Sequence, residues 1–144
     1  MTDFIRIPSN PAPKGGEVST LTSSDGAKLR TALFATEDAK ATVVLLSGRC
    51  EFIEKYFEVI EDLRARKFNV ATMDWRGQGL SDRMLPVSEK GHIQDFGAYK
   101  ADLCAFVDKV VRPRFDGPMV LMTHSMGGLP ALMTLAEGND AFSC

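Results

Sequence analysis

The fold is decided by the stretch Pro118-Met119-Val120-Leu121-Met122-Thr123-His124-Ser125-Met126-Gly127-Gly128. Its apolar run is short enough for a buried strand and leads directly into a serine followed by small residues. A helix-compatible segment, Leu129 to Glu137, comes next, and Gly138 is a typical helix stop. Strand, sharp turn with serine, and helix form the context of a nucleophile elbow, so the stretch predicts Ser125 as a nucleophile.

The residues around Ser125 suit such a turn, with one exception. We expect Gly127 to prevent a collision inside the turn and Gly128 to let the following helix approach the sheet closely. The helix start would offer free N–H groups and a positive dipole end to an oxyanion. Thr123 is the exception, because the usual Gly-x-Ser-x-Gly motif has a glycine there and a β-branched side chain crowds the turn. Taken alone, the pattern also fits a loop in which Ser125 is only a helix N-cap.

The residues before this stretch predict strands that alternate with helices. Residues 43–46 are apolar on both faces, as in a central parallel strand. The order is two strands joined by a hairpin turn, then three strand–helix units, which predicts an α/β fold with a mostly parallel sheet, right-handed crossovers and an antiparallel N-terminal hairpin. The expected strands are 18–21, 29–34, 40–47, 68–74 and the run before Ser125, and the expected helices are 51–67, 94–111 and 129–137.

Length and composition indicate one ordinary globular domain. The 144 residues are 44% hydrophobic and 25% charged, and the net charge of -2 provides no basic footprint for nucleic acid or an anionic membrane. Cys50, Cys104 and Cys144 are an odd number at unrelated spacings, which argues against a disulfide framework and favours the cytoplasm. We expect residues 1–16 to form a flexible arm that contains neither a signal peptide nor a membrane span, and residues 17–144 to form the N-terminal part of a domain.

Four motifs occur in order along residues 46–128. They are Ser47-Gly48-Arg49-Cys50-Glu51 with Tyr56; Asp74-Trp75-Arg76-Gly77-Gln78-Gly79-Leu80-Ser81; Gly91-His92 with Phe96, Tyr99 and Asp102-Leu103; and the serine stretch. With these motifs the chain resembles the N-terminal part of an α/β-hydrolase, closest to the bacterial lysophospholipase and monoacylglycerol lipase branch. The family commonly has His-Gly where this chain has Ser47-Gly48, which puts the local loop geometry in question.

The resemblance implies a reaction. Ser125 would attack the carbonyl of a carboxylic ester, plausibly of a lysophospholipid or monoacylglycerol, and form an acyl-enzyme. The backbone N–H groups of Arg49 and Met126 would hold the oxyanion. No metal or organic cofactor is implied. The expected partner is a small-molecule ester or lysolipid, with no nucleic acid and at most peripheral membrane contact.

The resemblance also implies supporting residues. Gly48 and Glu51 would shape and brace the loop that carries the first oxyanion donor. For Glu51 the alternative is a favourable charge in a helix's first turn, with Lys55 as its partner at i,i+4. The glycine-rich segment 76–79 lacks the spacing and the lysine of a phosphate-binding loop, and the resemblance places it as scaffolding beside the active site.

The histidines leave the triad incomplete. In α/β-hydrolases the chain order is nucleophile, acid, histidine, and no histidine follows Ser125 here. We expect His124 to point away from Ser125, and His92 to form a supporting hydrogen bond at the front of its helix. The strand before Ser125 would also become an exposed sheet edge. The sequence is therefore expected to be the N-terminal part of a longer hydrolase, with a fold that is truncated after the helix that follows Ser125. We expect this chain to be inactive alone.

Three other functions stay open. The same fold serves peptidases, epoxide hydrolases and dehalogenases, although the last two usually have an aspartate where Ser125 stands. A non-catalytic or degenerate relative would account for Thr123 and Ser47. An ordinary α/β binding domain could carry the serine stretch by chance, which four ordered motifs oppose.

Overall fold

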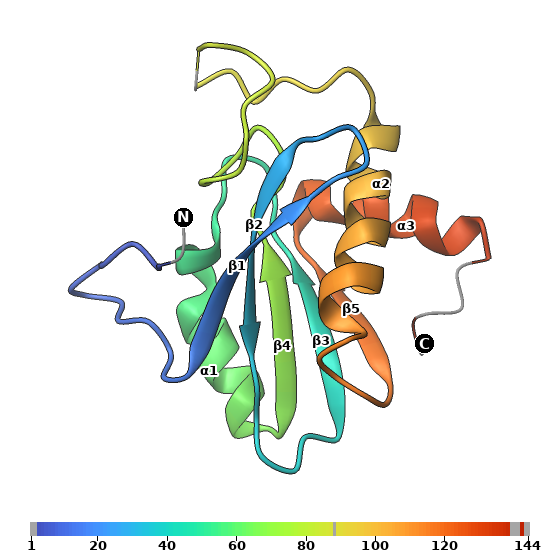
Figure 1. Cartoon of the computed structure of the whole chain (residues 1–144). Coiled ribbons are helices and arrows are strands. Elements are labelled where there is room, and N and C mark those ends of the chain that lie inside the picture. Colours follow the sequence, from blue (N-terminus) through green and yellow to red (C-terminus); the bar gives the residue numbers. More distant parts are fainter. Residues whose placement is uncertain (1–2, 88, 139–141, 143–144) are drawn as a thin grey trace.

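The computed structural model describes residues 3–87, 89–138 and 142, in which a five-stranded sheet carries helices on both faces (Figure 1). The third cysteine, Cys144, lies outside these residues. The strands are β1 (Gly16–Thr22), β2 (Lys28–Phe34), β3 (Ala41–Leu46), β4 (Phe68–Met73) and β5 (Met119–Thr123). Their order across the sheet is β1-β2-β4-β3-β5.

The sheet confirms the predicted fold class. β1 and β2 form an antiparallel hairpin, whose turn is closed by a 3.0 Å hydrogen bond from Gly26 N–H to Ser23 O. β2 pairs antiparallel with β4, while β3 pairs parallel with β4 on one side and β5 on the other. The strand before the serine is therefore an edge strand, as expected.

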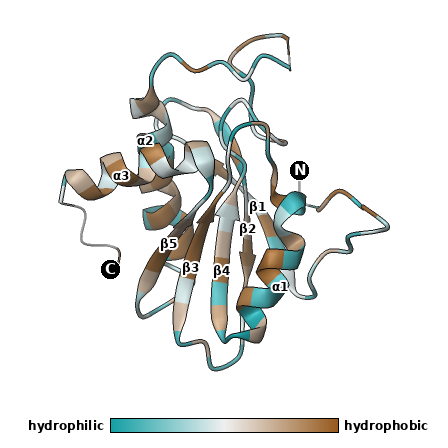
Figure 2. Cartoon of the chain, turned by 180° about the vertical axis from the view of Figure 1, so that it is seen from behind, coloured by the Kyte–Doolittle hydropathy of each residue, from teal (hydrophilic) through white to brown (hydrophobic). Residues whose placement is uncertain are grey.

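Side chains of β3 alternate between two apolar layers. Val43 and Leu45 pack with Phe57 and Ile60 on one face, and Val44 and Leu46 belong to a larger cluster on the other face. Burial on both faces is the reason for the uninterrupted apolar run in this strand. Figure 2 shows the sheet from behind, with largely hydrophobic β3 and β5 and, in front of the sheet, a helix that carries both hydrophobic and hydrophilic residues.

The helices lie close to their predicted positions. They are η1, a 3-10 turn (Ile53–Tyr56), α1 (Phe57–Ala65), α2 (Phe96–Phe106), η2, a π-helical turn (Val107–Val111), η3, a 3-10 turn (Ser125–Gly127), and α3 (Gly128–Ala136). α1 covers one face of the sheet, and α2 and α3 cover the other (Figure 1). Two starts are later than predicted. Phe52 is extended before η1, with φ -152°, and Asp95 is extended before α2, with φ -155°.

The described part of the N-terminal arm touches the body of the protein. The Phe4 ring stacks on Phe34 at 5.6 Å between centroids and meets Phe57 edge-on at 5.2 Å. Asn10 Nδ2 donates to Glu54 O at 2.8 Å. The arm thus extends the smaller apolar layer, and its flexibility stays a prediction.

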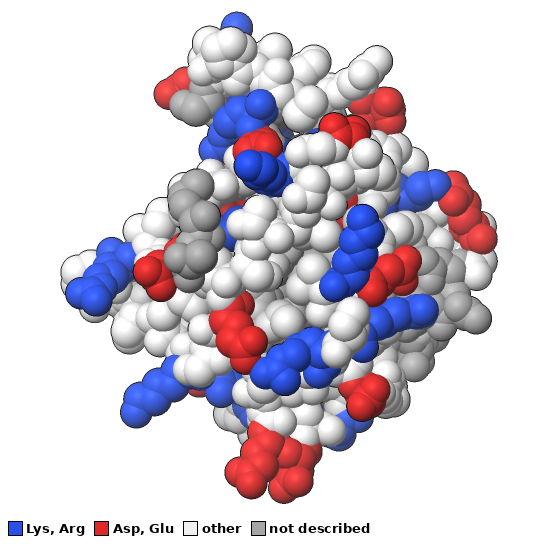
Figure 3. All heavy atoms as spheres, viewed as in Figure 1, with Lys and Arg blue, Asp and Glu red and all other residues white. Residues whose placement is uncertain are grey.

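Within the described ranges, no helix has the length and hydropathy to cross a membrane. On the face shown in Figure 3, positive and negative side chains are interspersed rather than segregated.

Candidate active site

Ser125 sits at a strained turn directly after β5. Its φ of +50° lies in the left-handed region, which serine adopts rarely and at a cost of about 1–3 kcal/mol. The residue is exposed, and η3 and α3 follow it without a break. Strand, strained serine and helix reproduce the geometry of a nucleophile elbow. The catalytic role of Ser125 stays a prediction.

The two glycines after the serine have different surroundings. A Cβ on Gly127 would lie 2.7 Å from Ser47 O and 2.9 Å from Leu46 O, so this position must be glycine for the elbow to pack against the end of β3. A Cβ on Gly128 would meet only Thr123 Oγ1, at an ordinary 3.5 Å. The expectation that Gly128 allows the close approach is therefore wrong, because Gly127 faces the sheet. The exposed side chain of Thr123 explains how the turn accommodates a β-branched residue.

The loop after β3 lies against the elbow. A Cβ on Gly48 would come within 3.1 Å of Ser125 Cβ. The N–H groups on either side of Arg49 are occupied, since Gly48 donates to Glu51 Oε2 at 2.6 Å and Cys50 donates to Gln78 Oε1. Within residues 3–87, 89–138 and 142, no acceptor is found for the N–H of Arg49 or of Met126. Both predicted oxyanion donors are thus free for a ligand.

Side chains from the segment after β4 fix this loop. Trp75 Nε1 donates to Ser47 O at 2.9 Å, and Asp74 Oδ1 accepts the N–H of Ile53 at 2.9 Å. Gln78 is buried, and besides binding Cys50 its Nε2 lies 3.7 Å from Met126 Sδ. The sequence identified this segment only as scaffolding. Gln78, whose side chain contacts Cys50 and Met126, was not predicted, because the residues next to it in the sequence do not indicate these contacts.

Two clusters of buried ion pairs involve the segment that follows β4. Arg30 binds Glu54 and Asp74, each at 2.7 Å, and all three side chains are buried. Burial raises the pKa of Asp74 despite the Arg30 guanidinium. Arg76 Nε binds Asp102 at 2.6 Å in the second cluster, where Ser23 Oγ also donates to Asp102. These ion pairs are scaffolding that joins β2, β4 and α2.

Glu51 connects the loop to the elbow. Its Oε2 accepts from Gly48 N–H at 2.6 Å and Tyr56 OH at 2.5 Å, and lies 3.1 Å from His124 Nδ1. Lys55 Nζ binds the other oxygen. The brace and the contact with Lys55 therefore occur together, but the first-turn part of the alternative is wrong, because Glu51 precedes η1, whose first-turn acid is Glu54. Burial opposes ionisation, but these donors outweigh it and lower the pKa of Glu51 from 4.5 to about 2.

Among the described residues, no hydrogen bond joins either histidine to Ser125. The His124 ring engages Glu51. A Cβ on Gly48 would lie 3.0 Å from His124 Nδ1 and 3.1 Å from Ser125 Cβ, so the expectation that the ring points away from Ser125 stays a prediction. His92 is exposed, and in the part of the chain that the structure describes its side chain forms no hydrogen bond, so the predicted supporting bond stays a prediction. Ser125 Oγ likewise has no hydrogen-bond partner among the described residues.

A cleft adjoins the candidate site. It has a volume of about 290 Å³ and lies between the loop after β3 and the segment after β4, with Arg49, Phe52, Gln78 and Arg83 in its walls. A larger cleft of about 650 Å³ is lined by residues 3–8, 11 and 12 and contains none of the predicted site residues. Across the described residues, no three His, Cys, Asp or Glu side chains are grouped to hold a metal ion.

Comparisons with known proteins agree with this geometry. The family model described as serine aminopeptidase, S33, matches residues 37–144. Lysophospholipase L2 of Escherichia coli strain K12 is 37% identical over 114 residues, which is 79% of this chain and 33% of that protein. Human monoglyceride lipase is 29% identical over 108 residues, 75% of this chain and 34% of the lipase. The chain thus spans about a third of the length of the curated relatives it matches.

Solved structures show the same fold at low sequence identity. The epoxide hydrolase VrEH1 from Vigna radiata superposes with a TM-score of 0.71 at 19% identity, covering 91% of this chain and 39% of that one. The mouse alpha/beta hydrolase domain-containing protein 10 superposes with a TM-score of 0.65 at 21% identity, covering 85% and 46%.

Proposed function

Because the chain belongs to the serine aminopeptidase S33 family of α/β-hydrolases, related to lysophospholipases and monoglyceride lipases, we propose that it carries the nucleophile of a serine hydrolase acting on carboxylic esters of lysophospholipids or monoacylglycerols. One observation carries the proposal: Ser125 is exposed at φ +50° directly after β5, beside two backbone N–H groups that have no acceptor in the described chain.

The proposed reaction has two steps. Ser125 Oγ attacks the ester carbonyl, and the N–H groups of Arg49 and Met126 bind the developing oxyanion. The ester C–O bond then breaks, the alcohol leaves with a proton, and water hydrolyses the acyl-enzyme. Loss of one oxyanion donor typically costs about 2.7–4 kcal/mol of transition-state stabilisation. The hydrogen bonds that fix the loop after β3 would therefore support the reaction rate by keeping the Arg49 N–H in place.

A chimaera tests the nucleophile. Residues 37–144 replace the matching segment of E. coli lysophospholipase L2, and the product is treated with a fluorophosphonate probe and assayed on lysophospholipid. Labelling and hydrolysis are expected, and Ser125→Ala should abolish both, whereas Ser47→Ala and Ser81→Ala should retain most of them. Circular dichroism confirms that each variant is folded. Equal labelling of a folded Ser125→Ala chimaera would refute the assignment.

A peptidase is the second candidate, favoured by the description of the matched family. The same acyl-enzyme chemistry would cleave an amide. Aminoacyl p-nitroanilides assayed with the same chimaera distinguish the two substrates, and we expect the ester to be turned over faster.

A further inference from the structure

Gln78 occupies a turn that leaves its backbone little freedom. Its N–H donates to Trp75 O at 3.0 Å, and its own carbonyl oxygen accepts the N–H of Ser81 at 3.1 Å. The next residue, Gly79, has φ +50°, and a Cβ there would lie 2.1–2.5 Å from the carboxylate of Asp74. Gln78 is 4% exposed. Its side chain therefore extends from a fixed backbone into the interior of the protein.

Hydrogen-bond chemistry determines which way the carboxamide of Gln78 faces. The N–H of Cys50 is a donor, so the atom of Gln78 that it meets is the acceptor Oε1. Nε2 is then directed to two groups that accept, the hydroxyl oxygen of Tyr99 at 3.4 Å and Sδ of Met126 at 3.7 Å. The site requires an acceptor on one branch of the side chain and a donor on the other, and glutamine provides both.

These contacts join the two halves of the predicted oxyanion hole. Cys50 directly follows Arg49, whose N–H is one expected donor, and Met126 carries the other. Each half contains a residue at positive φ, Cys50 at +60° and Ser125 at +50°. Such a conformation persists only where the surrounding structure holds it. Gln78 contacts both segments at these points, so it fixes one relative to the other.

Glu51 joins the same two segments at a different place. Its carboxylate binds the N–H of Gly48 and the ring of His124, residues that precede the two expected donors. Gln78 adds an attachment on the other side of Arg49. The peptide group that carries the Arg49 N–H is therefore held at both ends.

We propose that Gln78 is a positioning residue for the proposed reaction, in which its carboxamide keeps the N–H groups of Arg49 and Met126 at the spacing that one oxyanion requires. This inference rests on the proposed function, since it needs Ser125 to generate an oxyanion. The role concerns the transition state rather than the bound ester, because the oxyanion forms only as Ser125 attacks. A buried glutamine that only stabilised the fold would not show this selectivity.

The chimaera with lysophospholipase L2 tests the role, because all the side-chain partners of Gln78 lie within residues 37–144. Gln78→Met keeps a side chain of similar length but removes the acceptor for Cys50 and the donor to Met126. On a short-chain p-nitrophenyl ester, its kcat should be about 10- to 100-fold lower at a nearly unchanged KM, as for a misplaced oxyanion donor. Gln94→Met makes the same replacement at an exposed position and should leave both constants unchanged.

Two inhibitors distinguish the transition state from the ground state. An alkyl trifluoromethyl ketone adds to Ser125 and creates an oxyanion, whereas the ether analogue of the ester has no carbonyl group and binds without one. Gln78→Met should weaken binding of the ketone by the same factor as it lowers kcat/KM, and should leave the affinity for the ether unchanged. Equal weakening of both inhibitors would indicate a general loosening of the site and would overturn the proposal.

A second variant tests the role even where Gln78→Met fails to fold. Gln78→Glu retains an acceptor for the N–H of Cys50, and its carboxyl group also offers a donor when it is neutral. The ratio of its kcat to that of the unsubstituted chimaera should therefore rise toward one as the pH is lowered from 8 to 5.5. A ratio that stays low at every pH, in a chimaera that circular dichroism shows to be folded, would contradict the role of the carboxamide.

The outcomes separate this inference from the proposed function. Ser125-dependent hydrolysis that is unchanged in a folded Gln78→Met chimaera would refute the positioning role alone. Absence of Ser125-dependent hydrolysis in the unsubstituted chimaera would refute the ester hydrolase, and the positioning role with it.

Discussion

Gly127 decides, at the scale of single residues, whether the elbow can form. It and Gly128 have helical φ values of -60° and -66°, so alanine is compatible with the backbone at both positions. The difference between them lies in what a Cβ would meet, two carbonyl oxygens within 3 Å at residue 127 and one hydroxyl at 3.5 Å at residue 128.

This pair gives a matched prediction. Gly127→Ala should lower the free energy of unfolding by about 1–3 kcal/mol, the usual range for overpacking. Gly128→Ala should be neutral or stabilise by up to about 1 kcal/mol, because alanine has the higher helix propensity. Urea denaturation of both variants measures the difference, and equal effects would mean that the elbow does not pack on β3 as described.

Glu51 makes stability depend on pH. Its pKa in the folded protein, about 2, lies below the ordinary value of 4.5, so ionised Glu51 stabilises the folded state above pH 4.5. That contribution is lost as the pH falls from 4.5 toward 2. Glu51→Gln should be less stable than the wild-type chain at pH 6, and the difference should shrink across this interval. Thermal unfolding from pH 6 to 2.5 checks it, and parallel curves would contradict the shared-carboxylate arrangement.

Residues that belong to a pattern of consecutive positions could be predicted from the sequence. Ser125 and Gly127 could be identified because strand, serine and glycine are consecutive. Gln78 could not, since its partner Cys50 is 28 positions away and only the folded sheet brings their loops together. Gly128 was assigned the wrong role because one residue of rotation on a helix start exchanges which glycine faces the sheet.

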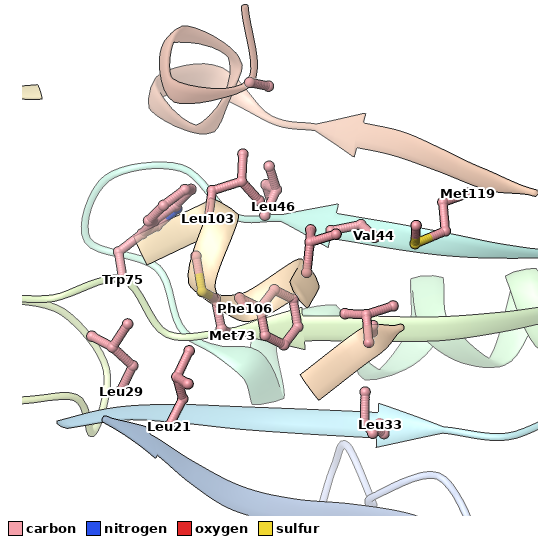
Figure 4. Packing of buried hydrophobic residues seen from close by; sticks show 14 of the residues in the cluster. Leu21, Leu29, Leu33, Val44, Leu46, Met73, Trp75, Leu103, Phe106 and Met119 are labelled. Atoms are coloured by element: carbon pink, nitrogen blue, oxygen red, sulfur yellow. The ribbon is translucent and has the colours of Figure 1, made fainter. Parts of the chain in front are cut away.

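At the scale of elements, helical periodicity identified α2 and its buried side. Phe106 and Leu103 are fully buried between the helix and the sheet, near Val44, Leu46 and Met73 (Figure 4). The boundaries were less predictable. Periodicity alone does not show that the last turn widens into the π-helical turn η2, nor that Asp95 is extended before the helix.

The burial of Phe106 gives a stability prediction. Phe106→Ala should cost about 3–5 kcal/mol, enough to unfold a marginal domain. Phe96→Ala is the control on the same helix, because Phe96 is 39% exposed, and should cost less than about 1 kcal/mol. Guanidinium denaturation compares the two variants. A small loss at Phe106 would mean that the helix register is misassigned.

At the scale of the whole molecule, the order of elements along the chain predicted the α/β class, but not the order of strands across the sheet. The chain crosses from β2 to β3 and then places β4 between them, an insertion that no single segment encodes. The exposed apolar residues of β5 and α3, hydrophobic in Figure 2, follow from that order. They are Val120, Met122, Leu129, Leu132 and Leu135.

The position of β5 and the histidines together determine how the isolated chain should behave. An edge strand with exposed Val120 and Met122 is a template for association, so we expect the purified 144-residue chain to aggregate.

Removing a triad member leaves about 10³–10⁴-fold catalysis over water when the rest of the site is intact. Here the His124 ring engages Glu51, and among the described residues no histidine is hydrogen-bonded to Ser125, the predicted nucleophile. We therefore expect soluble, monomeric chain to hydrolyse a short-chain p-nitrophenyl ester no faster than its Ser125→Ala variant. Turnover that disappears in both Ser125→Ala and His92→Ala would instead identify His92 as the base, brought to the serine by a movement of the loop from which it extends.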